Sequence, residues 1–102
     1  MPTPAEIAST LLGFQAEISV MPESLDQTQK DRLEVIAGDL GTADTDVQEL
    51  GASAARKKVV EGRIRTAEVI CNIASSGGEL PASDNKNCVG ALTQAAGILN
   101  SL

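Results

Sequence analysis

The stretch TDVQELGASAARKKVVEGRIRTAEVICNIA, residues 45–74, decides how the whole chain is read. Apolar residues in its second half recur at alternating spacings of four and three, the period of one face of an amphipathic helix. They are Val60, Ile64, Ala67, Cys71 and Ala74. The stretch also holds five of the eight basic residues of the chain. We therefore expect a long helix over residues 44–75 that buries one side and exposes charge on the other.

Three other segments repeat this coiled-coil-like spacing, and the alternating pattern of β-strands is absent. The sequence therefore predicts an all-α fold, a helical bundle of three to four helices in a single domain over residues 1–102. The expected helices are at about 3–21, 24–41, 44–75 and 85–101. Apolar positions on the three further helices include Ile7, Leu11, Phe14, Ile18, Leu33, Ile36, Leu40, Leu92 and Leu99.

Local signals place most of the helix ends. Thr3 followed by Pro4 and Glu6 forms a capping box at the first helix. Ser24 is the expected cap of the second helix, and Asp84 or Asn85 that of the last.

The break between the second and third helices is open to two interpretations. Gly38 and Gly41 weaken a helix, which favours a turn at about Gly41–Asp44. The apolar spacing of three and four nevertheless continues from Leu33 to Ala54 without interruption. The alternative is therefore one continuous helix of about 75 Å at 1.5 Å per residue.

Charge is segregated along the chain, which has a formal net charge of −6. Residues 1–50 hold ten acidic residues against two basic ones, whereas residues 51–66 hold five basic residues against one acidic. Overall acidity disfavours nucleic acid as a partner, and the asymmetry favours contact between the oppositely charged parts, within one chain or between copies. Arg56 and Arg63 project beside the apolar stripe of their helix, so we interpret them as interface charges.

The two cysteines lie on the apolar sides of consecutive helices that should run antiparallel. Cys71 is near the end of one helix and Cys88 is near the start of the next, with sixteen residues between them. A hairpin would bring them to the same height, and a disulfide there would contribute about 3 kcal/mol. Two buried free thiols are the alternative, because no secretion signal is evident.

The sequence offers little for catalysis. Histidine and tyrosine are absent, so the usual proton shuttle is missing and neither cysteine has a histidine partner. The acidic residues do not follow a calcium-loop pattern, and two cysteines alone do not form a zinc site. No glycine-rich motif binds phosphate or a dinucleotide. We therefore expect no enzyme activity, no cofactor and no metal.

Interaction is the function that remains. We expect a structural or assembly protein that packs through apolar stripes and complementary charge, as components of a viral particle or another large assembly do. Its partners would be proteins, in a homo-oligomer or a larger assembly. The alternative is a monomeric adaptor that presents a groove to a partner helix. No signal peptide or membrane span is recognisable, so we expect a soluble cytoplasmic or virion protein.

Overall fold

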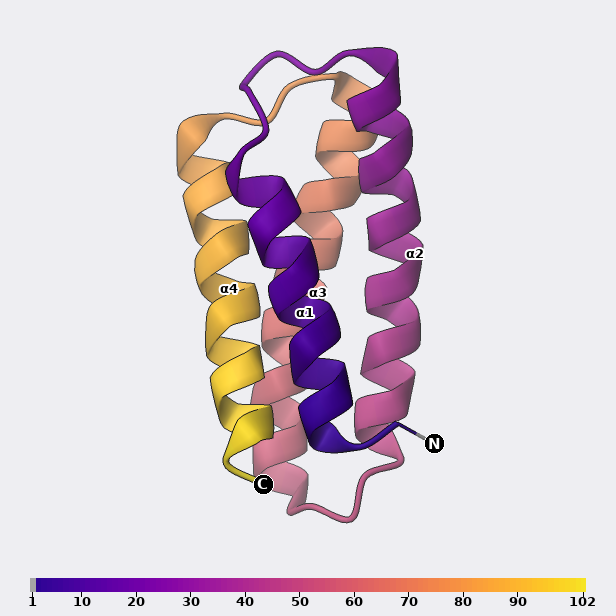
Figure 1. Cartoon of the computed structure of the whole chain (residues 1–102), viewed down its shortest axis with the longest axis vertical. Helices are drawn as coiled ribbons and strands as arrows, with labels where there is room; N and C mark the ends of the chain where they lie inside the picture. The colour runs from indigo at the N-terminus through magenta and orange to yellow at the C-terminus, as the bar shows by residue number, and fades with distance from the viewer. Residues whose placement is uncertain (1) are drawn as a thin grey trace.

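The computed structural model describes residues 2–102, which form four helices (Figure 1). They are α1 (Pro4–Ser19), α2 (Gln27–Gln48), α3 (Ala54–Gly77) and α4 (Ala82–Asn100). The helices run alternately up and down in a bundle of 40 × 22 × 18 Å. No β-strand occurs within residues 2–102, so the predicted all-α bundle is confirmed.

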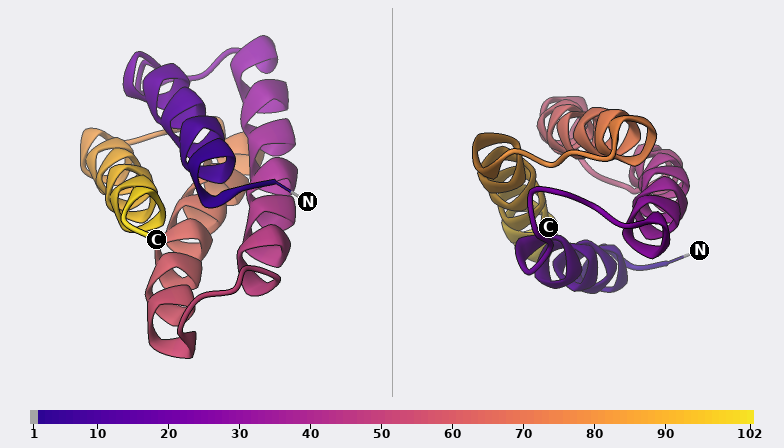
Figure 2. Two further views of the ribbon diagram at one scale, coloured as in Figure 1. Left: turned by 60° about the horizontal axis from the view of Figure 1, so that its bottom comes forward. Right: turned by 90° about the horizontal axis from the view of Figure 1, so that it is seen from above.

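The helices surround the core in the order in which they follow one another along the chain. Each helix packs on the one before it and the one after it, and α4 closes the ring against α1 (Figure 2). The edge between α1 and α2 is therefore opposite the edge between α3 and α4. The contact between α1 and α2 is the smallest of the four.

The core is built from the apolar side chains that the spacing singled out. Leucine and isoleucine fill its centre, and Phe14 is its single aromatic residue. No polar or charged residue among residues 2–102 is fully buried. The stripe residues Ile7, Leu11, Phe14, Ile18, Val60, Ile64, Leu92 and Leu99 are all buried.

Capping boxes hold the starts of the first two helices. The Thr3 hydroxyl accepts a hydrogen bond from the Glu6 amide at 3.2 Å, as the sequence predicts. The cap of α2 is Asp26 rather than Ser24, because the Asp26 carboxylate accepts from the Gln29 amide at 2.8 Å. The helix therefore starts at Gln27, three residues after the predicted start.

Ser24 belongs instead to a short bridge between two loops at one end of the bundle. It pairs with Glu79 in antiparallel fashion. The Leu25 amide donates to the Gly78 carbonyl at 2.9 Å, and the Leu80 amide donates to the Glu23 carbonyl at 2.7 Å. Contacts so distant in sequence leave no local signal, which explains why the start of α2 was placed too early.

The turn between α2 and α3 lies at residues 49–53 rather than at Gly41–Asp44, and the two helices are not continuous. Gly38 and Gly41 lie inside α2, and each weakens this helix by about 1 kcal/mol relative to alanine. Leu40 and Val47, both fully buried, bind this part of α2 to the core. Burying one such side chain contributes about 1.5–3 kcal/mol, which outweighs the glycine penalty. The chain turns at residues 49–53 although the apolar spacing runs on to Ala54, and Ser53 caps α3.

The last helix also starts earlier than its predicted caps. It begins at Ala82, directly after Pro81, and Asp84 and Asn85 lie within its first turn. The Asn85 side chain is used in tertiary contact, donating from Nδ2 to the Ile18 carbonyl at 2.7 Å. This hydrogen bond ties the start of α4 to the end of α1.

Candidate interaction surfaces

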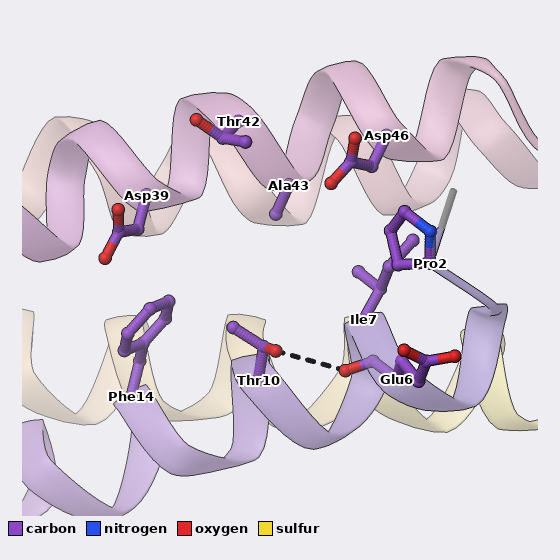
Figure 3. Close-up of a pocket in the computed structure, with 9 residues that line it drawn as sticks. All are labelled: Pro2, Glu6, Ile7, Thr10, Phe14, Asp39, Thr42, Ala43 and Asp46. Carbon is purple, nitrogen blue, oxygen red and sulfur yellow. Dashed lines mark hydrogen bonds between the residues drawn. The ribbon is translucent and has the colours of Figure 1, made fainter.

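A groove of about 280 Å³ lies between α1 and α2, where the bundle is least tightly closed (Figure 3). Ile7 and Phe14 of α1 point toward α2, and Ala43 completes an apolar floor. Phe14 is 8% exposed and lines this opening. We call this surface the acidic groove, because its charged lining residues are Glu6, Asp39 and Asp46.

The three carboxylates of the acidic groove form no salt bridge with any other part of residues 2–102. Glu6 accepts hydrogen bonds from Thr3, and the Thr10 hydroxyl donates to the Glu6 carbonyl at 3.1 Å (Figure 3). The bonds from Thr3 orient the Glu6 carboxylate without neutralising its charge. Three negative charges beside an apolar floor make a surface complementary to cationic, partly apolar side chains.

A salt bridge joins α1 and α2 beyond the Phe14 end of the acidic groove. Arg32 donates from Nε and Nη2 to the two oxygens of Glu17 at 2.8 and 2.7 Å, a bidentate pair. Hydrogen bonding from Arg32 lowers the pKa of Glu17, and the same bonds raise the pKa of Arg32. Asp39 adds a weaker attraction for Arg32.

The opposite edge of the bundle carries basic residues. Two open pockets lie between α3 and α4. Arg56, Val59 and Ile98 line one pocket, and Arg63, Ile70 and Lys86 are among the residues that line the other. Every charged residue in the two linings is basic. We call this surface the basic face; its apolar part includes Val59, which is 49% exposed.

Arg56 and Arg63, the predicted interface charges, are both exposed on this basic face. Neither forms a salt bridge within residues 2–102. The ion pairs of α3 use Arg65, which lies 2.8 Å from Glu61 and 3.5 Å from Asp44 of α2. Part of the basic stretch is thus neutralised inside the chain, while Arg56 and Arg63 remain available to a partner.

Lys57 is also engaged within the bundle. Its ammonium group donates to the Gln48 carbonyl at 2.8 Å and so satisfies an acceptor at the end of α2. The Gln48 side chain in turn donates to Glu61 at 3.0 Å. The α2–α3 edge is therefore held by several polar contacts as well as by its apolar packing.

Cys71 and Cys88 are buried free thiols that lie side by side between α3 and α4. The hydrogen bond with Cys88, together with burial, raises the pKa of the Cys71 thiol. The same hydrogen bond lowers the pKa of Cys88, since a Cys88 thiolate would accept it, and burial opposes this. The hairpin thus brings the cysteines together as the spacing suggested, and their disulfide remains a prediction.

The acidic groove was not singled out from the sequence, although its periodicity is readable there. Arg32, Asp39 and Asp46 recur at intervals of seven residues and so lie along one flank of α2. The expected turn at Gly41–Asp44 separated Asp39 from Asp46 and hid this row. Once α2 is continuous, the row faces α1.

In the part of the chain that the structure describes, His, Cys, Asp and Glu form no group of three or more that could hold a metal ion. The helices of this part include none that is both long and apolar enough to cross a membrane. No family model, curated protein or solved structure matches the chain.

Proposed function

We propose that this chain is a non-enzymatic structural protein that associates with further copies of itself, as the subunits of viral particles and other large assemblies do. The observation that carries the proposal is the pair of oppositely charged surfaces. In the acidic groove, three carboxylates without salt bridges within residues 2–102 border a floor of buried apolar side chains. The basic face combines Arg56 and Arg63, which also lack salt bridges there, with Val59, which is 49% exposed. An interface between copies would use both surfaces, because opposite charges would then face each other across it.

The arrangement of the remaining polar groups agrees with a structural role. The two thiols are buried, and each is the main influence on the pKa of the other. Most carboxylates lie on the surface, where capping and ion pairing account for several of them. Catalytic sites ordinarily combine a nucleophile or metal with a polarised acid or base in a cavity.

The test is the mass of the protein in solution, measured by light scattering on a sizing column over a range of protein concentrations. Raising the salt from about 0.1 M to about 1 M shortens the screening length from about 10 Å to about 3 Å. We expect an oligomer at low salt that dissociates at high salt. A monomer that is indifferent to concentration and salt would contradict self-association.

A monomeric adaptor is the second candidate, and the acidic groove favours it. An open groove with an apolar floor and acidic rims suits a basic amphipathic helix of another protein. In that case the chain stays monomeric and binds such a helix. Fluorescence anisotropy with a labelled basic amphipathic peptide measures this, with a scrambled peptide of the same charge as control; equal affinity for both would count against the adaptor.

A further inference from the structure

We propose that copies of this chain associate head to tail, with the basic face of one copy seated on the acidic groove of the next, so that the bundles form open rows. This inference rests on the self-association proposed above and specifies its geometry. The occupant of the acidic groove is a second copy of the same chain.

The first step is the placement of the two surfaces. The ring order of the helices puts the α1–α2 edge and the α3–α4 edge on opposite sides of the bundle (Figure 2). A copy bound through its basic face therefore still presents its own acidic groove on the far side. Such an interface is heterologous, and it leads to a ring or an open filament rather than a closed pair.

The second step is the match between the charges along the bundle axis. Asp39 and Asp46 are seven residues apart on α2, and Arg56 and Arg63 are seven residues apart on α3. Each pair therefore spans about 10.5 Å at 1.5 Å per residue. Because the two aspartates and the two arginines are spaced by the same distance, both arginines of one copy can pair with both aspartates of the next.

The third step is the position of these charged residues along the bundle axis. Asp46 lies two residues before the end of α2, and Arg56 lies two residues after the start of α3. These ends are joined by one short loop at the same end of the bundle (Figure 1). A neighbour shifted sideways without rotation thus brings Arg56 level with Asp46 and Arg63 level with Asp39.

One apolar residue lies between the charges on each surface. Val59, which is 49% exposed, lies between the two arginines; Ala43, which lines the groove but is only 6% exposed, lies between the two aspartates. The bundle is 40 Å long and 22 Å across, so one long face approaches the area of about 800 Å² that each partner contributes to a standard interface. Sideways translation without rotation repeats the same contact at every copy, which makes the row straight and open.

The test uses charge reversal on one surface at a time. The first variant is D39K/D46K, which makes the groove basic; the second is R56E/R63E, which makes the basic face acidic. D31K/E34K is the matched control, because it changes the charge as much as the first variant does at exposed positions of α2 outside the groove. Far-UV circular dichroism verifies that each variant is folded, and light scattering gives the mass.

We expect each of the two reversals to weaken self-association by at least about tenfold, since like charges then face each other across the interface. An equimolar mixture of the two variants should associate again, because each kind of contact is complementary in the mixture. The control should behave as the wild type. The wild-type mass should rise steadily with concentration instead of levelling at that of a dimer.

The inference is overturned if the wild type associates and both reversals associate equally well, or if the wild-type mass levels at a dimer. In those cases self-association itself stands and only its geometry is wrong. A wild type that stays monomeric at every concentration and salt overturns the proposed function as well.

Discussion

Replacing Gly38 by alanine should increase the free energy of unfolding by about 1 kcal/mol. Gly38 is exposed in the middle of α2, and a Cβ added there would meet nothing within 4 Å. The substitution removes the entropy that glycine loses in a helix and adds no clash. If the chain turned at Gly41–Asp44 instead, Gly38 would lie close to a helix end and the gain would be smaller.

Replacing Gly41, in the same helix, by alanine should stabilise the protein less than replacing Gly38. A Cβ there would lie 3.0 Å from Oε2 of Glu68, the end of a flexible side chain on α3. Glu68 must therefore move, and the gain from Gly41→Ala should be smaller than that from Gly38→Ala. In a Glu68→Ala background the obstacle is gone, so the gain at Gly41 should rise to that at Gly38.

Replacing Gly78 by alanine should instead lower the free energy of unfolding. This residue ends α3 with a φ of 75°, in the left-handed region that alanine adopts only at a cost of about 1–2 kcal/mol. Gly78→Ala should therefore destabilise the protein by about that amount. Its added Cβ would be 3.5 Å from Lys30 Cδ, an ordinary contact, so the cost comes from the backbone.

Urea unfolding followed by far-UV circular dichroism measures all of these changes, and thermal unfolding checks them. A change of 1 kcal/mol shifts the melting temperature of a domain of this size by about 4–8 °C. Destabilisation by both Gly38→Ala and Gly41→Ala would refute a continuous α2, because alanine is favoured over glycine throughout a helix.

Three further results are expected. Leu92→Ala should lower the free energy of unfolding by about 3 kcal/mol in urea, because it leaves a cavity at a fully buried position; a loss below about 1 kcal/mol would contradict that packing. Hydrogen bonding from Arg32 lowers the pKa of Glu17 in the fold, so the pair stabilises the protein above the ordinary glutamate pKa. Glu17→Gln should therefore cost up to about 1 kcal/mol near pH 7, and a pH series of urea midpoints should show the cost vanishing as the pH falls through the folded pKa of Glu17. Cys71 and Cys88 should react with a maleimide much more slowly in the native protein than in urea, and comparing urea midpoints with and without reductant shows whether a disulfide adds about 3 kcal/mol.

Local chemistry accounts for what could be predicted. The capping box of Thr3 and Glu6 involves neighbours in sequence, so α1 was placed to within two residues at both ends. The buried sides of the helices follow from apolar spacing, because a helix that must bury one face carries its leucines and isoleucines every three or four residues. The adjacency of Cys71 and Cys88 was suggested by the same spacing and a short connection.

The tertiary structure decided where two helices begin or end. Gly38 and Gly41 favour a break when α2 is considered alone, and only the burial of Leu40 and Val47 in the assembled core outweighs them. Ser24 could have capped α2, but the bridge to Glu79 takes it out of that position. The bridge to Glu79 leaves no local signal, whereas a helix that continues through Gly41 was one of the two interpretations that the apolar spacing allowed.

The sequence by itself determined the helical segments, their apolar sides and the segregation of charge, because these are properties of single segments; it left open whether the second and third helices are separate. It could not determine which charges meet, because neighbouring residues on a helix are separated by about 100° and their partners depend on how each helix is rotated in the bundle. Packing assigned Arg65 to Asp44 and left Arg56 and Arg63 exposed. The ring order of the helices, a property of the whole fold, then placed those two arginines opposite the acidic groove.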